Sequence, residues 1–233
     1  TYTEQNPTVI YNTEGLYDAK LAIQNAQGSD MIDYLGAVKV GGTCPVWNIG
    51  IDESLNLNAI NMSFYGYYGG TNWLDMYAFA ERYEKPAVKS EVSAVDIYFY
   101  DTKTVISPVD ITVSIRNEKE GLPGDVLATV SMSTDDLVNN PSTWLPTTFT
   151  FSTPIDIEEA FYIVVEGFPN RTDDGTYQDD QVVMGAIKRD ANSTKQSTVY
   201  HYGPDYDNPG AGDVWLKNAD ENVSFAIAPR LTY

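Results

Sequence analysis

The feature that most constrains this chain is the strict alternation of apolar and polar residues in several short segments. In DITVSIRN (110–117) every second residue is apolar, and VSAVDIYFY (92–100) ends on the alternating Val95, Ile97 and Phe99. Side chains in a β-strand point to opposite faces in turn, so this pattern gives one apolar and one polar face. It predicts an antiparallel sheet packed on a second sheet. The same alternation appears in VLATVSM (126–132), TTFTFS (147–152), AFYIVVEGF (160–168) and VSFAIAP (223–229).

Weaker segments complete the expected set of a dozen or so short strands, which favours an all-β, antiparallel β-sandwich. One helical turn is expected in TDDLVNNP (134–141), capped by Thr134 or Asp135, and a short helix could begin in NTEGLYDAKLAI (12–23). Gly121 and Pro123-Gly124 are turn residues that predict a hairpin connection. The weaker strand segments are IDYLGAVKV (32–40), PVWNIGI (45–51), NAINMSFYGYY (58–68), MYAFAERY (76–83) and QVVMGAI (181–187).

The charge balance excludes two classes of partner. With 33 acidic and 14 basic residues, the chain of 233 residues carries a formal charge of −19. Nucleic-acid phosphates and anionic membrane surfaces both require clustered Lys and Arg, so we expect no binding to nucleic acid and no insertion into a membrane. No apolar run approaches the ~20 residues of a membrane span. The acids instead favour an exposed, soluble protein or local carboxylate clusters for a cation.

Cysteine content does not decide the compartment, because the single Cys44 permits no disulfide within the chain and suits both cytoplasm and bacterial surface. The first residues, TYTEQNPTV, show neither a charged n-region nor an apolar h-region. Either the protein has no signal peptide or the sequence starts after one.

A family resemblance covers about two thirds of the chain. It is carried by MYAFAERYEKPAVKSEVSAVDIYFYD (76–101), a hairpin with G-L-P-G-x-x-L at 121–127, STWLPTTFTF followed by AFYIVVEGF, and the closing strand VSFAIAP. This order resembles the jelly-roll-like β-sandwich modules of secreted and surface proteins of the Bacteroidetes. The resemblance implies export to an extracellular or cell-surface location and an ancillary role in adhesion, proteolysis or glycan handling. It supplies no catalytic residue.

The domain organisation predicted from these patterns is a single structural domain. Residues 76–233 form its jelly-roll-like core, and residues 1–75, outside the resemblance, form an N-terminal β elaboration of the sandwich.

No catalytic motif stands out in the sequence. Cys44 is followed by strand-like residues rather than a helix, so we expect a buried, inert thiol and no dyad with His201, the only histidine. There is no G-x-S-x-G elbow, and one His and one Cys are too few for a zinc site. Glycoside hydrolysis needs only two placed carboxylates. Glu81 and Glu166 lie in strand-like segments, but on a sandwich we expect them to face solvent.

Two acidic loops are candidate calcium sites, because Ca²⁺ prefers carboxylate and carbonyl oxygens. The sequence DYDNPGAGD begins like an EF-hand loop, but Pro209 and Leu216 replace required ligands, so it is not an EF-hand. A loop site of another type stays open, as does a merely solvated loop. The candidate ligands are Asp173, Asp174, Asp179 and Asp180 in the first loop, and Asp205, Asp207 and Asp213 in the second.

Aromatic residues are the candidate ligand-binding groups. The chain has 17 tyrosines and 4 tryptophans, whose flat rings can stack on sugars. The alternative is that they form cross-strand pairs on exposed sheet faces, and Trp144 is expected at the edge of the core. The candidates are Tyr65, Tyr67, Tyr68, Asn72 and Trp73 in a Gly-rich loop, with Tyr202 and Tyr206 near the C-terminus.

The sequence therefore predicts a non-catalytic extracellular binding or adhesion module. Its expected partner is a glycan or a surface protein, and its only expected cofactor is calcium held by the loops. Two alternatives stay open: a glycosidase that uses paired carboxylates, and a structural or assembly module of a surface protein.

Overall fold

The computed structural model describes residues 7–11, 15–49, 56–86, 89–103, 108–139, 145–169, 180–190, 193, 196–218 and 222–232. The chain forms two compact units, the first comprising Thr1–Cys44 with Thr232–Tyr233 and the second Pro45–Leu231. This division falls at residue 44, whereas the sequence patterns placed a boundary at residue 75 within one domain. Residues 45–75 therefore belong with the larger unit.

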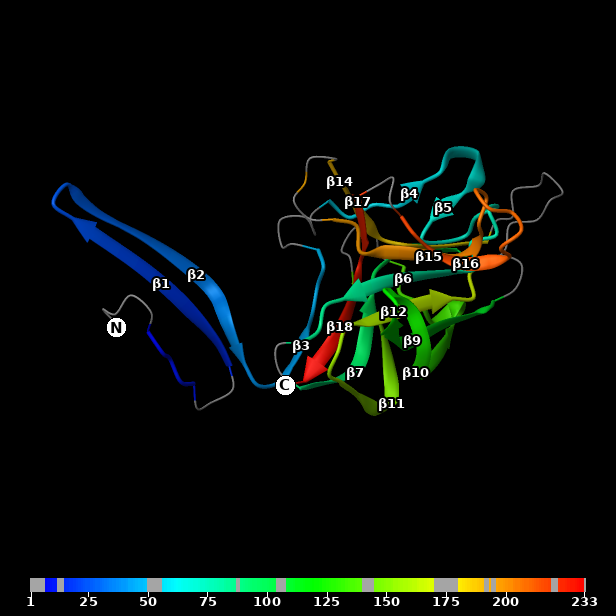
Figure 1. Ribbon diagram of the computed structural model, residues 1–233. Helices are drawn as coiled ribbons and strands as arrows, with labels where there is room; N and C mark the ends of the chain where they lie inside the picture. Colours follow the sequence, from blue (N-terminus) through cyan, green and yellow to red (C-terminus); the bar gives the residue numbers. More distant parts are fainter. Residues whose placement is uncertain are drawn as a thin grey trace. The chain divides into compact units, whose positions relative to one another are not determined.

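The first unit contains one long antiparallel hairpin of strands β1 (Gly15–Asn25) and β2 (Gly28–Val40) (Figure 1). The predicted strand at 32–40 is confirmed as part of β2. The predicted helix start within 12–23 is wrong, because Leu21 pairs with Ile32 and Ile23 with Asp30 in a strand ladder. Pairing with β2, with one register shift between Tyr17 and Ala19, satisfies the backbone groups on one edge of β1 in place of helical hydrogen bonds.

The second unit is an antiparallel β-sandwich, as the alternation predicted. A six-stranded sheet has the order β10–β9–β12–β6–β15–β16, and a four-stranded sheet has the order β11–β7–β18–β3 (Figure 1). The jelly-roll order implied by the family resemblance stays a prediction. The strands of these sheets are β3 (Thr43–Pro45), β6 (Ala78–Tyr83), β7 (Ser90–Ile97), β9 (Asp110–Lys119), β10 (Leu122–Ser133), β11 (Thr147–Ile157), β12 (Phe161–Glu166), β15 (Val199–Pro204), β16 (Asp213–Lys217) and β18 (Ile227–Thr232).

Three two-stranded sheets accompany the sandwich. They pair β4 with β5, β8 with β13 and β14 with β17, and the 3₁₀ turns η2 and η3 lie between strands. Among the described residues no helix is long and apolar enough to cross a lipid bilayer. The bounds are β4 (Ile60–Asn61), η2 (Ser63–Tyr65), β5 (Tyr67–Tyr68), β8 (Phe99–Lys103), η3 (Thr134–Asp136), β13 (Gln181–Met184), β14 (Ala186–Arg189) and β17 (Asn222–Phe225).

The core lies between the two large sheets. Val113 and Ile163 from the six-stranded sheet, and Val95, Phe149 and Ile227 from the four-stranded sheet, belong to one cluster of buried side chains. Each of these five residues is fully buried. Burying a side chain of this size contributes roughly 1.5–3 kcal/mol relative to leaving it in water, so this shared cluster holds the sheets face to face.

Three local predictions need correction. PVWNIGI continues from β3 without further strand structure after Pro45 over the described residues 46–49. The 58–68 segment is not one strand but a β4–β5 hairpin around η2. The turn at 134–136 is confirmed, but its cap is Ser133, whose hydroxyl accepts from the Asp135 backbone N–H.

The β9–β10 hairpin is confirmed, although its turn lies three residues before the Pro-Gly pair. Glu120 and Gly121 occupy the corner, with φ of 55° and 79°, as a primed two-residue turn requires. Pro123 and Gly124 lie inside β10, where the register shifts between Pro123 and Val126. They form a bulge rather than the corner.

Substitutions at this corner test the assignment. A non-glycine residue at positive φ is strained, and asparagine tolerates it better than glutamate. We expect Glu120→Asn to raise the free energy of unfolding by about 0.5 kcal/mol and Gly121→Ala to lower it by about 1 kcal/mol. A Cβ at Gly121 would meet no atom within 4 Å, so only the backbone conformation changes. Urea denaturation measures both effects, and an unchanged Gly121→Ala variant would contradict the turn.

Candidate functional site

The six-stranded sheet has one face in the core and one face turned away from it, here called the outer face. Residues directly opposite each other on antiparallel strands share a face. Tyr162 of β12 lies between Arg82 of β6 and Arg116 of β9 and belongs to the outer face. Its neighbour Phe161 points into the core, where its ring stacks on Tyr83 at 5.2 Å between centroids.

Aromatic rings cover the centre of the outer face. Tyr162 and Tyr200 are buried there in an edge-on pair, with centroids 5.3 Å apart. Tyr202 and Trp215 are only partly buried and pack against this cluster. They are directly opposite each other on β15 and β16, with ring centroids 5.4 Å apart and planes at 52°. The outer face therefore presents two adjacent aromatic rings to solvent.

Charged side chains surround these rings. The Arg116 guanidinium lies over Trp215, 5.9 Å from the ring centroid, and 3.7 Å from the Glu166 carboxylate. Arg82 is ion-paired with Glu118 and with Glu84. Arginine stems cover apolar surface while their heads stay hydrated, so these residues help to bury Tyr162. Stacking rings beside fixed hydrogen-bonding groups form a surface suited to a polar ligand with flat faces.

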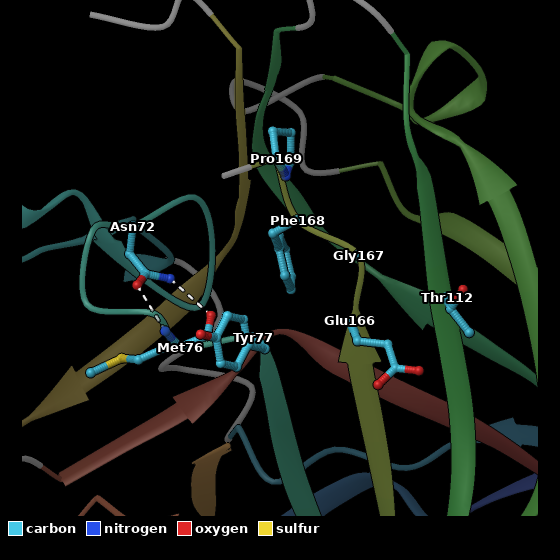
Figure 2. Close-up of a pocket in the computed structure, with 8 residues that line it drawn as sticks. All are labelled: Asn72, Met76, Tyr77, Thr112, Glu166, Gly167, Phe168 and Pro169. Carbon is cyan, nitrogen blue, oxygen red and sulfur yellow. Dashed lines mark hydrogen bonds between the residues drawn. The ribbon is translucent and has the colours of Figure 1, made fainter. Parts of the chain in front are cut away.

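A pocket of about 430 Å³ opens at one end of this face, where β12 ends (Figure 2). Figure 2 shows Asn72, Met76 and Tyr77 on one side and Glu166 and Thr112 on the other. Glu166 and Thr112 are opposite each other on β12 and β9 and also belong to the outer face. The lining residues are Asn72, Met76, Tyr77, Thr112, Glu166, Gly167, Phe168 and Pro169.

Gly167 sets the direction of the chain beside this pocket. Its φ is +92°, and a Cβ at this position would collide with the carbonyl oxygen of Asp110. Only glycine permits this close approach, which turns the chain after Glu166 and places Phe168 at the pocket.

Acidic residues lie near the pocket's tyrosine. The pKa of the Tyr77 phenol is raised above its ordinary value by partial burial and then by Asp75, Asp213 and Tyr206. Tyr77 is still 43% exposed, and its backbone N–H donates to the Tyr202 carbonyl at 2.8 Å. This hydrogen bond connects the loop before β6 to β15, the strand that carries Tyr200 and Tyr202.

A second pocket, of about 360 Å³, lies where the outer face meets β14 and β17. We call it the basic pocket, because Arg82, Arg189 and Lys217 line it together with one carboxylate, Glu84. Its hydroxyl and amide groups come from Asn48, Gln196, Ser197, Thr198 and Ser224, and its aromatic wall is Tyr200.

Glu81 lies directly beneath the basic pocket and is fully buried. One carboxylate oxygen accepts from Asn48 Nδ2 at 2.7 Å and from the Thr198 hydroxyl, and the other accepts from the Phe225 backbone N–H at 2.9 Å. The expectation that Glu81 faces solvent is therefore wrong. Glu81 lies on the same, core-facing side of β6 as Phe79 and Tyr83. Buried hydrogen-bond donors replace water around its carboxylate.

Burial raises the pKa of Glu81 from its ordinary 4.5 to about 7, although the hydrogen bonds from Thr198, Phe225 and Asn48 and the charge of Arg189 act in the opposite direction. A carboxyl group that titrates near neutral pH beside a pocket marks a region of functional interest. The sequence contained a signal for it, because AFAERY places Glu81 on the apolar face of its strand.

The Gly-rich loop divides into structural and exposed residues. Tyr68 is 5% exposed and stacks on Phe225 in the core, so it presents no ring face to solvent. The Asn72 side chain is occupied, donating to the Gly70 and Met76 carbonyls and accepting from the Leu74 and Met76 N–H groups.

The remaining loop aromatics lie nearer the surface. Tyr65 is 50% exposed, Tyr67 and Trp73 are partly buried, and Trp73 packs edge-on against the exposed Phe64 at 4.7 Å. The loop therefore offers Phe64 and Tyr65 to solvent rather than the five residues predicted together.

The two C-terminal tyrosines named from the sequence behave differently. Tyr202 belongs to the outer face, whereas Tyr206 is 61% exposed and donates its hydroxyl to the Leu74 carbonyl at 3.0 Å. Trp215, Tyr200 and Tyr162 were not among the predicted binding residues. Alternation within VYHYG does place Tyr200 and Tyr202 on the same face of their strand. Strand pairing then brings Tyr162 and Trp215 to that face.

The acidic loops do not form a metal site among the described residues. No group of three or more His, Cys, Asp or Glu side chains there could hold a metal ion. The Asp205 carboxylate accepts from the Asp207 and Asn208 N–H groups and so shapes its own turn. Asp180 is buried, while Asp173, Asp174 and Asp179 lie outside the described residues, as does Trp144. Calcium binding stays a prediction.

The candidate catalytic residues are dispersed. Cys44 is a partly buried free thiol on β3. His201 lies on β15, with Nδ1 3.4 Å from the Tyr68 hydroxyl, and burial lowers its pKa. Among the described residues that line the 430 Å³ pocket, Glu166 alone carries a carboxylate. Glycoside hydrolysis requires a second acid, and these described residues do not supply one.

Substitution of Glu81 tests its environment through pH. Burial favours the protonated form of Glu81, so the unfolded chain loses this proton near pH 4.5 and the folded chain only near pH 7. The contribution of Glu81 to the free energy of unfolding is therefore full below pH 4.5 and is lost as pH rises to about 7. We expect the free energy of unfolding to fall by about 3 kcal/mol over this window because of Glu81 alone. Glu81→Gln should remove that slope, measured by urea denaturation at pH 4.5 and pH 8.

The matched control is Glu84→Gln, because Glu84 directly follows the end of β6 and its side chain is 84% exposed. This variant should keep the wild-type dependence on pH. Equal slopes for wild type and Glu81→Gln would contradict the assignment of a raised pKa to Glu81.

No protein-family model matches this chain. A search of curated proteins gives no match either. The resemblance to Bacteroidetes surface modules therefore stays a prediction.

Proposed function

We propose that this chain is a non-catalytic extracellular binding or adhesion module whose ligand is a glycan. The proposed binding surface is the outer face of the six-stranded sheet together with the 430 Å³ pocket at its end. The observation that carries the proposal is the partly exposed pair of Tyr202 and Trp215, with Arg116 over the Trp215 ring and Glu166 beside Arg116.

The arrangement suits a sugar for physical reasons. Sugar rings combine a flat apolar C–H face with a rim of hydroxyl groups, so they stack on aromatic rings and accept or donate hydrogen bonds at their edges. Trp215 and Tyr202 supply the rings, while Thr112, Glu166 and Tyr77 supply polar groups in the adjoining pocket. A rigid sheet holds all of these groups in place before a ligand arrives, which reduces the entropy lost on binding.

The extracellular location in this proposal is supported by the net charge of −19, the family resemblance and the excess of surface acids. The proposed partners are glycans or surface proteins, and loop calcium remains an optional part of the proposal. Calcium would contribute by ordering the acidic loops rather than by chemistry.

Substitution of Trp215 tests the proposed binding surface. A glycan array identifies a ligand, and calorimetry then measures its Kd with added Ca²⁺ and with EDTA. We expect Trp215→Ala to weaken binding by at least tenfold, because stacking on this ring is lost. Tyr65→Ala removes an exposed ring from the Gly-rich loop and should leave the Kd unchanged.

Three results would count against parts of this proposal. The absence of any glycan ligand in either buffer would overturn it. Loss of binding in Tyr65→Ala but not in Trp215→Ala would move the site to the Gly-rich loop. Equal Kd values with Ca²⁺ and with EDTA would remove calcium from the proposal.

A second candidate function is assembly, and the β1–β2 hairpin favours it. Leu21, Ile23 and Ile32 share one face of the hairpin and are 56%, 61% and 47% exposed. Among the described residues neither strand pairs with a third strand. An isolated two-stranded hairpin is marginally stable in water, and open strand edges favour association with another chain.

Self-association of the purified protein tests this second function. We expect the sedimentation coefficient to rise with protein concentration, because contact between hairpins buries the exposed apolar face. The double variant Leu21→Ser, Ile32→Ser should sediment as a monomer throughout. The matched control is Lys20→Ser with Asp33→Ser, which alters the opposite face of the hairpin. A wild-type protein that stays monomeric at every concentration would contradict assembly between copies.

A further inference from the structure

The basic pocket stands out against the charge of the whole chain. Acidic residues outnumber basic residues by 33 to 14, yet the described residues that line this pocket include three basic side chains and one carboxylate. Arg82 and Lys217 reach it from the outer face, on β6 and β16, and Arg189 reaches it from β14. Such a local reversal of charge favours an anionic ligand and disfavours a cation.

The three basic groups differ in how they are held. Arg82 is ion-paired with Glu84 and Glu118, so most of its charge is compensated. Arg189 is fixed by hydrogen bonds to the Ser224 hydroxyl at 3.0 Å and the Asn48 carbonyl at 3.1 Å. Lys217 is exposed and makes no ion pair with the part of the chain that the structure describes.

A buried network holds the wall of this pocket in one arrangement. Glu81 accepts from Asn48 and Thr198 below the pocket, and the Thr198 hydroxyl lies 2.9 Å from the Ser224 hydroxyl. Ser224 in turn accepts from Arg189. The guanidinium and hydroxyl groups are therefore positioned before any ligand binds, which is the arrangement that selects for a small charged group.

The basic pocket adjoins the aromatic rings of the proposed glycan surface. Lys217 and Trp215 are two residues apart on β16 and share the outer face, so their Cα atoms are separated by about 7 Å. Tyr200, which lines the pocket, is opposite Lys217 and belongs to the same aromatic cluster as Trp215. A single chain of sugars can therefore contact both the rings and the pocket.

We propose that the glycan is acidic, and that the basic pocket receives a carboxylate or sulfate group from a sugar next to the one stacked on Trp215. This inference rests on the proposed glycan function. Lys217 supplies the uncompensated charge, Arg189 supplies the fixed donor, and Thr198 and Gln196 supply neutral polar groups around the anion.

Calorimetry with paired ligands tests this proposal. The probes are an oligosaccharide of glucuronate and glucose, a sulfated oligosaccharide, the matched neutral glucose oligosaccharide, and free glucuronate and sulfate. We expect an acidic oligosaccharide to bind at least tenfold more tightly than the neutral one, and its Kd to rise between 50 and 300 mM NaCl. The better of the two acidic ligands identifies the anionic group as carboxylate or sulfate.

Lys217→Gln gives the decisive comparison. Its Kd for the preferred acidic oligosaccharide should rise at least tenfold, while its Kd for the neutral one stays unchanged. The control is Lys89→Gln, which makes the same charge change at a lysine paired with Asp156 beside the four-stranded sheet. This control should behave as wild type, and urea denaturation verifies that both variants fold.

The outcomes separate the two proposals. If acidic and neutral oligosaccharides bind equally and Lys217→Gln has no effect, the acidic ligand is wrong and the glycan function stands. If free glucuronate or sulfate binds in a manner that depends on Lys217 while every oligosaccharide fails, the anion pocket stands and the glycan function is wrong. If no probe binds, both are wrong.

Discussion

The central pairing of β6 with β12 is the constraint on which the larger unit depends. Both strands are almost wholly buried, because one face packs into the sandwich core and the other lies under tyrosines and arginine stems. Each side chain on these strands must therefore pack against, or hydrogen-bond to, the residues above or below the sheet. Glu81 satisfies this requirement with hydrogen bonds, and Val164 satisfies it with apolar contacts on the opposite face.

Alternation along the chain was sufficient to predict the sandwich, because period-2 patterns encode which side chains share a face. It was insufficient where pairing partners decide the structure. Residues 15–23 contain helix-favouring Ala, Leu and Lys, yet pairing with β2 makes them a strand. Pro123-Gly124 suited a turn, but Glu120-Gly121 had the two positive φ angles that close a right-twisted hairpin.

The candidate site was less predictable, because its residues meet only after folding. Local reasoning favoured the Gly-rich loop, where rings and an amide lie close in sequence, but Tyr68 and Asn72 are used inside the protein. The outer face instead combines Arg116, Tyr202 and Trp215 from three strands. The donors to Glu81 are similarly remote, at separations of 33, 117 and 144 residues.

The buried carboxylate also limits which substitutions position 81 can accept. An apolar residue at position 81 would leave the Asn48 amide, the Thr198 hydroxyl and the Phe225 backbone N–H without an acceptor. Only proline would remove the last of these donors, and proline would interrupt β17. An apolar replacement therefore requires matching changes at several distant positions at once. Positions 48, 81 and 198 should consequently vary together across descendants of this chain, as one inherited unit.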